Sequence, residues 1–137
     1  MKKLATLLLA LLLSLQTLSA FAGYDEPLFV TITSDCCSTC QKLKPVVEDL
    51  EYDYGSQVTF LTLDVSTRNS IEESRQKANE YGIGNFFEKN LGAVPRVAIL
   101  CPGGEKVDKT FLGEIRKEIY RQALDELLLD TTKVCSL

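Results

Sequence analysis

Two cysteines separated by two residues, Cys37 and Cys40, are the side chains of this chain best suited to chemistry. They follow an apolar run at residues 28–33 and precede an amphipathic run that begins at Gln41, which predicts a strand, a turn and then a helix. The N-terminus of a helix favours the thiolate, which is the reactive form of cysteine. Thiols at this spacing can close a reversible disulfide, form an inert bridge or bind a metal ion, and the rest of the sequence has to distinguish these uses.

Three further cysteines, Cys36, Cys101 and Cys135, bring the total to five. Because five is odd, at least one thiol stays free or pairs with another chain. Cys36 is either an accessory thiol that exchanges with its neighbours or a small half-buried side chain. Cys101 and Cys135 are candidates for a structural disulfide, which would stabilise the fold by about 3–4 kcal/mol.

The composition excludes several classes of function. The chain has no histidine, so Ser-His-Asp and Cys-His catalysis and imidazole metal ligands are ruled out. Its net charge of −4 and its lack of basic clusters argue against nucleic acid as a partner. We predict no metal at the cysteines, while a carrier that holds copper or zinc through Cys36, Cys37 and Cys40 stays as an alternative.

The first residues have the pattern of a secretory signal peptide. Lys2 and Lys3 form a basic start, residues 4–15 are almost wholly apolar, and an Ala-x-Ala sequence ends at Ala22. We predict cleavage after Ala22 and export to the periplasm or an equivalent extracytoplasmic space. The apolar segment is close to the length of about 20 residues that spans a bilayer. The protein would therefore be attached to a membrane only if this segment stayed uncleaved.

The predicted domain organisation is therefore a signal peptide at residues 1–22 and one domain at residues 23–137. All five cysteines lie in the second part. In an oxidising compartment, these thiols either pair or are kept reduced by a partner protein.

Hydrophobic periodicity predicts alternating strands and helices in the domain. The predicted strands are residues 28–33, 58–65, 96–100 and 106–111. One helix follows the cysteines and ends at Gly55, and two more follow the second and fourth strands. This order predicts an α/β fold, a three-layer sandwich with a central four-stranded mixed sheet flanked by helices.

Two helices have predicted boundaries that the structure can test. Ser70 and Glu73 resemble a capping box that opens a helix ending at about Tyr81. Residues 85–90 form either one more helical turn or a loop. The last helix follows Gly113, and its predicted apolar face consists of Ile115, Ile119, Ala123, Leu127 and Leu128.

Taken together, these features resemble the thioredoxin-fold family. The resemblance covers roughly residues 27–129. It rests on the strand before the dithiol, a proline inside the next helix, a Val-Pro pair before an apolar strand, and glycines at a hairpin and before the last helix. The residues concerned are Cys37, Cys40, Pro45, Val94, Pro95, Gly103, Gly104 and Gly113.

The resemblance implies a role for each residue of the site. Cys37 would be the exposed attacking thiol, and Cys40 the buried thiol that resolves the mixed disulfide. Pro95 would be cis, and would leave the backbone of Val94 free to hold an extended segment of the substrate. It implies no cofactor beyond the redox-active disulfide itself.

Several residues depart from the family pattern. Cys36 stands where thioredoxins usually have tryptophan, and Ser38-Thr39 replaces their Gly-Pro pair. Thr31 stands where thioredoxins have a buried acid. The lysine partner of that acid aligns with about Thr62. The segment 67–93 is longer than its thioredoxin equivalent, and such an insertion is well placed to select partners.

We therefore expect a thiol–disulfide oxidoreductase that exchanges disulfides with partner proteins and is reset by an upstream redox partner. We expect it to be a monomer. Besides the metal carrier, a non-catalytic thioredoxin-like binding module that uses residues 67–93 remains an alternative.

Overall fold

The computed structural model describes residues 25–104 and 106–136. The predicted signal peptide at residues 1–22 and its cleavage site lie outside this part of the chain. Within the described part, no helix is long and apolar enough to cross a membrane.

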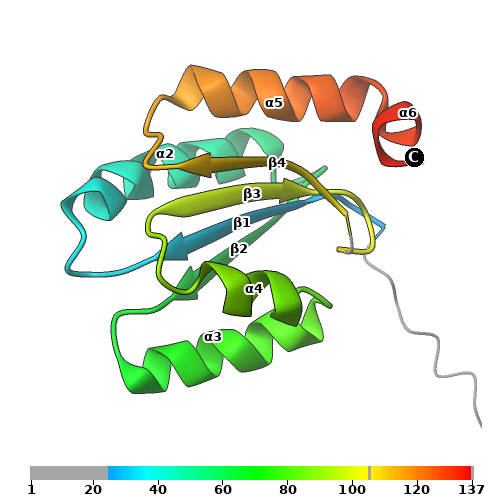
Figure 1. The fold of residues 1–137 in the computed structure, drawn as a ribbon. Helices are drawn as coiled ribbons and strands as arrows, with labels where there is room; N and C mark the ends of the chain where they lie inside the picture. The colour runs from blue at the N-terminus through cyan, green and yellow to red at the C-terminus, as the bar shows by residue number, and fades with distance from the viewer. Residues whose placement is uncertain (1–24, 105, 137) are drawn as a thin grey trace, which may run out of the picture.

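A four-stranded mixed sheet lies at the centre of the fold (Figure 1). Its strands are β1 (Leu28–Thr33), β2 (Thr59–Asp64), β3 (Arg96–Leu100) and β4 (Val107–Leu112). They are ordered β2-β1-β3-β4. β1 runs parallel to β2 and antiparallel to β3, and β3 runs antiparallel to β4. The predicted sheet is thereby confirmed.

Helices cover both faces of the sheet. They are α2 (Ser38–Tyr54), α3 (Arg68–Glu80), α4 (Gly84–Asn90), α5 (Lys117–Leu129) and α6 (Thr131–Cys135). Figure 1 shows α2 and α5 on one face and α3 and α4 on the other, which gives the predicted three layers. The short helix α6 was not predicted.

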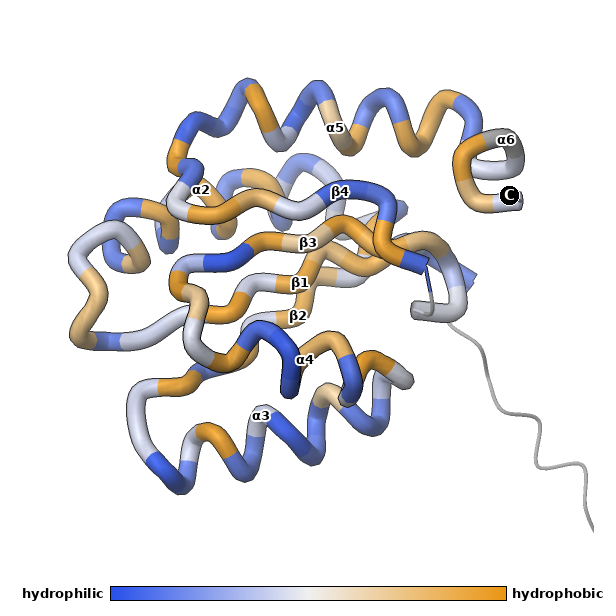
Figure 2. Tube along the Cα trace, viewed as in Figure 1, coloured by the Kyte–Doolittle hydropathy of each residue, from blue (hydrophilic) through white to orange (hydrophobic). Residues whose placement is uncertain are grey.

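An apolar core fills the space on each side of the sheet. On one face, Phe29, Leu50 and Tyr120 belong to the layer beneath α2 and α5. On the other face, Val30 and Phe87 belong to the layer beneath α3 and α4. Because β1 is a central strand between these layers, it contributes apolar side chains to both, and Figure 2 shows the central strands as largely hydrophobic.

The capping box of α3 lies three residues earlier than predicted. The Thr67 hydroxyl accepts a hydrogen bond from the backbone N–H of Ser70, and the Ser70 hydroxyl accepts one from the backbone N–H of Thr67. Ser70 is thus the third residue of the helix and not its cap, because Thr67 has the extended backbone that an N-cap requires. Residues 85–90, predicted as a helical turn or a loop, belong to α4.

The predicted apolar face of the last helix was wrong at its first residue. Ile115 precedes α5 and is 38% exposed, since the helix begins only at Lys117. The residues of α5 that are buried are Tyr120, Ala123, Leu124 and Leu127.

Tyr120 should contribute to stability through its hydroxyl as well as its ring. The side chain is fully buried, its ring meets Phe29 and Phe111 edge-on, and its hydroxyl donates a hydrogen bond to the backbone carbonyl of Glu114 at 2.6 Å. Tyr120→Phe leaves that carbonyl without its donor. We expect the free energy of unfolding in urea to fall by about 1–2 kcal/mol. Tyr52→Phe, at a 91% exposed tyrosine, is the matched control and should change nothing measurable.

Candidate active site

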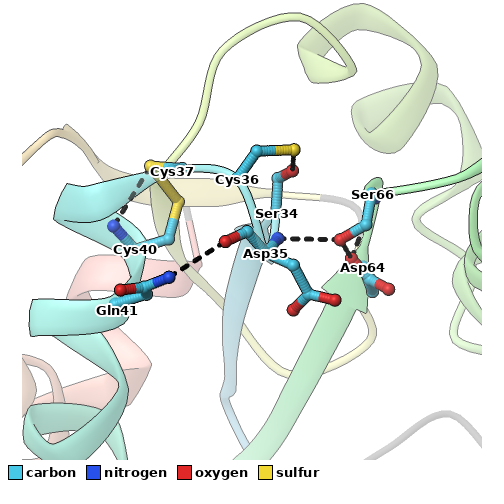
Figure 3. Close-up of a disulfide and its surroundings, with 8 residues drawn as sticks. All are labelled: Ser34, Asp35, Cys36, Cys37, Cys40, Gln41, Asp64 and Ser66. Atoms are coloured by element: carbon cyan, nitrogen blue, oxygen red, sulfur yellow. Dashed lines mark hydrogen bonds between the residues drawn. A yellow bond between two sulfur atoms is a disulfide. The ribbon is translucent and has the colours of Figure 1, made fainter.

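The dithiol lies where the loop after β1 turns into α2 (Figure 3). Cys37 is the N-cap of α2, and its sulfur accepts a hydrogen bond from the backbone N–H of Cys40 at 3.1 Å. The two residues form a disulfide, with their Cα atoms 5.1 Å apart. Cys37 is partly exposed, whereas Cys40 is only 3% exposed. A partner molecule can therefore approach Cys37 but not Cys40.

The start of α2 provides a favourable electrostatic environment for a thiolate at Cys37. The first turn of the helix contains no acidic residue, so the partial positive charge of the helix N-terminus is not neutralised there. The backbone N–H that reaches the sulfur of Cys37 would stabilise its anionic form. The nearest acid in the chain, Asp35, is an exposed residue of the loop.

Hydrogen bonds fix this loop on two sides (Figure 3). The Gln41 side chain donates to the backbone carbonyl of Asp35 at 3.1 Å, and the backbone N–H of Asp35 donates to the Ser66 hydroxyl at 2.8 Å. Ser66 in turn donates to Asp64 from both its hydroxyl and its backbone N–H. Burial alone would raise the pKa of Asp64, but the hydrogen bonds from Ser66 outweigh burial, and the pKa is lowered. Asp64 therefore stays a carboxylate and keeps the loop anchored to β2.

Cys36 is exposed and belongs to neither disulfide. Its sulfur lies 3.6 Å from the Ser34 hydroxyl and points toward that residue, away from the disulfide (Figure 3). The half-buried position considered for Cys36 is therefore wrong, because the loop directs its side chain to solvent. Within the described part of the chain, no group of three or more His, Cys, Asp or Glu side chains is placed to hold a metal ion.

The Val94–Pro95 pair lies at the same end of the sheet as the dithiol loop. Arg96 begins β3 and pairs with Ile32 near the end of β1, which places the preceding proline beside the strand that leads to Cys37. The Val94–Pro95 peptide bond is cis. Pro95 is buried, and its carbonyl accepts a hydrogen bond from the backbone N–H of Gly113 at 3.0 Å.

Comparison with known proteins identifies the family. The thioredoxin family model matches residues 16–86, which is more than half of the chain. This chain belongs to the thioredoxin family. Over 104 residues it is 25% identical to the chloroplastic thioredoxin M-type of Brassica napus, an alignment that covers 76% of this chain and 50% of the relative. Over 102 residues it is 28% identical to thioredoxin 2 of Chlorobaculum tepidum, covering 74% of this chain and 79% of that relative. The chain thus spans half the length of the first relative.

The second disulfide of this thioredoxin-family chain lies away from the dithiol. Cys101 follows the end of β3 and is 2% exposed, and it is bonded to Cys135 in α6, with the Cα atoms 5.6 Å apart. Lys106 adds a hydrogen bond from its ammonium group to the backbone carbonyl of Val134 at 2.7 Å. The bridge and this hydrogen bond hold α6 against the end of β3 opposite to Pro95.

A cleft beside α2 was missed from the sequence. It has a volume of about 440 Å³ and lies between α2 and the strands β1 and β2, with Cys40 in its lining. The strand residues that line it include Thr31 and Thr33 of β1 and Thr62 and Asp64 of β2. The alternation of these polar residues at every second position of both strands was the available indication, because such residues share one face of a sheet.

Proposed function

We propose that this chain is a thiol–disulfide oxidoreductase that exchanges disulfides with partner proteins through Cys37 and Cys40. The observation that carries the proposal is the disulfide at the start of α2, in which one sulfur belongs to a partly exposed residue and the other to a buried one. Membership of the thioredoxin family supports the same activity.

The chemistry proceeds through two exchange steps. The thiolate of Cys37 attacks one sulfur of a client disulfide, which breaks that bond and forms a mixed disulfide. The thiolate of Cys40 then attacks the sulfur of Cys37, so that the client leaves with both of its cysteines reduced. Two electrons have passed from the dithiol to the client. The same steps in reverse oxidise a client, and a second redox protein restores the starting state in either case.

The position of Val94–Pro95, at the end of the sheet where the dithiol loop lies, supports a place for the client chain. In the proposed complex, an extended segment of the client lies along the backbone of Val94 next to the dithiol. Leu112, 61% exposed, precedes the Gly113 that is hydrogen-bonded to Pro95, and so adds apolar surface beside this position. The redox-active disulfide needs no further cofactor for this reaction.

We further propose that the protein acts after export, in an extracytoplasmic compartment. The basic start, the apolar run and the Ala-x-Ala sequence of residues 1–22 support this proposal. Fractionation of expressing cells, with N-terminal sequencing of the exported chain, is the measurement. A mature chain that begins at Gly23 is expected, and a chain retained uncleaved in the cytoplasm would contradict the proposal.

A redox titration tests the proposed activity. The full chain is equilibrated with graded ratios of reduced and oxidised glutathione, and the state of Cys37 and Cys40 is read by thiol alkylation and mass spectrometry. We expect a reversible two-electron transition that disappears in Cys37→Ser. Cys36→Ser, at the neighbouring exposed thiol, is the matched control and should keep the transition.

The other candidate functions predict different results in the same titration. A disulfide that stays closed under strong reduction, together with no activity on a model disulfide, would favour a non-catalytic binding module. Stoichiometric copper or zinc in the untreated protein would favour a metal carrier.

A further inference from the structure

Arg96 is a charged residue in an otherwise apolar row that crosses the sheet. Ile32 of β1 is paired with Leu63 of β2 and with Arg96 of β3. Arg96 is in turn paired with Leu112 of β4. Paired residues share a face of the sheet, and this row is on the face beneath α3 and α4, because Ile32 and Leu63 belong to the core there. Arg96 thus lies between a fully buried isoleucine and a leucine that is 61% exposed.

The guanidinium of Arg96 has no partner in the described part of the chain. Its Nε atom is buried and makes no hydrogen bond there, and no carboxylate of those residues forms an ion pair with it. Arg75 and Arg116, by contrast, are each paired with glutamate. The residue as a whole is partly exposed, so its terminal Nη nitrogens are the part that reaches solvent. Arg96 is therefore a partly desolvated cation without a counter-ion.

Packing alone does not explain an arginine at this position. The stem of a long charged side chain can cover the edge of an apolar core while its charge stays in water. Methionine or lysine would give the same cover without burying an unpaired N–H group, and such a group destabilises a fold. The charge of Arg96 is therefore better explained by an anion that binds to the protein from outside.

Arg96 lies at the end of the sheet where the dithiol loop begins. Its partner Ile32 is near the end of the strand that leads to Cys37, and Figure 1 shows the start of β3 and the loop between β1 and α2 at the same edge of the sheet. In the proposed complex, the client segment lies along the backbone of Val94, two residues before Arg96. Leu112 is paired with Arg96 and adds apolar surface beside it. A client held at Val94 therefore passes next to the guanidinium.

A carboxylate is the anion that best fits this side chain in a disulfide-bearing client. A guanidinium presents its N–H donors in a planar fork, which can bind both oxygens of a carboxylate through parallel hydrogen bonds. Partial burial keeps water from part of the group, and this strengthens its attraction to an anion. The chain as a whole carries a net charge of −4, so the unpaired cation also determines where an acidic client docks.

We propose that Arg96 is a specificity-determining residue that binds a carboxylate of the disulfide-bearing substrate. This inference rests on the proposed function. In the complex, the Nη nitrogens donate hydrogen bonds to the carboxylate oxygens while the substrate backbone lies along Val94. The contact forms on docking and changes no bond of the exchange reaction. It favours substrates with an acidic group beside their cysteine. Acidic side chains of a client protein and glutathione both present such a group, and the test distinguishes the two.

The test compares substrates that differ only in charge. The full chain carries Cys36→Ser and Cys40→Ser, so that Cys37 is the reactive thiol outside the Cys101–Cys135 bridge. The substrates are short peptides with blocked ends, whose one cysteine is joined by a disulfide to nitrothiobenzoate. Glutamate, glutamine or lysine stands directly before or after that cysteine. The thiolate of Cys37 attacks the peptide sulfur, and nitrothiobenzoate leaves with the electron pair of the broken bond. Stopped-flow absorbance of this chromophore gives the second-order rate constant. The corresponding disulfides of glutathione and of its diethyl ester form a second series.

We expect the glutamate peptide to react about tenfold faster than the glutamine peptide in at least one of the two positions, and the lysine peptide to react more slowly than both. Arg96→Met should abolish this preference and leave the rate of the glutamine peptide unchanged. Arg96→Lys, which keeps the charge without the planar fork, should retain part of it. Arg68→Met removes an exposed arginine at the same end of the sheet, is the matched control and should keep the preference in full. The melting temperature of Arg96→Met should equal or exceed that of the parent, because an unpaired buried N–H group is removed.

The second series shows which source of carboxylate the site prefers. A preference among the peptides assigns the site to acidic side chains of client proteins. A preference for glutathione over its diester, absent among the peptides and abolished by Arg96→Met, assigns the same site to glutathione.

Two results would overturn the inference while leaving the proposed function intact. One is equal rate constants for charged and neutral substrates in both series. The other is an Arg96→Met variant that keeps the preference of the parent, because the carboxylate would then bind elsewhere. If Cys37 releases the chromophore from none of the substrates, it is not a reactive thiol, and the proposed function fails together with the inference.

Discussion

Replacing Cys40 with serine should leave the protein covalently joined to its clients through Cys37. The exposed thiol can still attack a client disulfide, but the buried thiol that breaks the mixed disulfide is gone. Because the hydroxyl of serine does not displace a disulfide, the adduct should last about a thousandfold longer, for hours instead of seconds. Non-reducing electrophoresis of cell extracts, followed by mass spectrometry of the adducts, measures this directly.

Two double variants show which thiol holds the client. Cys37→Ser with Cys40→Ser should give no adduct. Cys36→Ser with Cys40→Ser should keep it, because the sulfur of Cys36 points toward Ser34 and away from the disulfide. Adducts mapped to Cys36 would contradict the assignment of Cys37 as the attacking thiol.

The disulfide between Cys101 and Cys135 should account for a large part of the stability of the domain. It joins residues 34 positions apart, and a closed loop of that size stabilises a fold by about 3–4 kcal/mol through the restricted unfolded chain. The bridge also holds α6, from which Val134 and Cys135 pack against the core layer beneath α5. We expect Cys135→Ala to lower the free energy of unfolding in urea by about this amount, measured without reductant.

Cys36→Ala is the matched control, since it removes an exposed thiol that forms no disulfide. Its free energy of unfolding should stay within about 0.5 kcal/mol of the parent. Cys135→Ala should also keep the glutathione transition of Cys37 and Cys40, because the two bridges lie at opposite ends of β3. A Cys135→Ala variant as stable as the parent would show that the second bridge has no structural role.

The sheet and most helix positions were predictable because their patterns are local. The short strand predicted at 96–100 coincides with β3, and Gly55 ends α2 as expected. The predicted start of α3 was wrong because two nearby residues could each have been its N-cap. Thr67 and Ser70 both have hydroxyls suited to an N-cap, and only the backbone path out of β2 selects Thr67.

The dithiol itself was determined by the sequence, because a spacing of two residues at the start of a helix brings two thiols within bonding distance whatever the rest of the chain does. The structure adds what depends on the packing of distant elements. It pairs Cys101 with Cys135, which requires α6 to return to the end of β3, and it directs the side chain of Cys36 to solvent. It also places the hydroxyl of Thr31 in the cleft lined by Cys40, since only the register of β1 with β2 and the position of α2 above them bring these residues to one cleft.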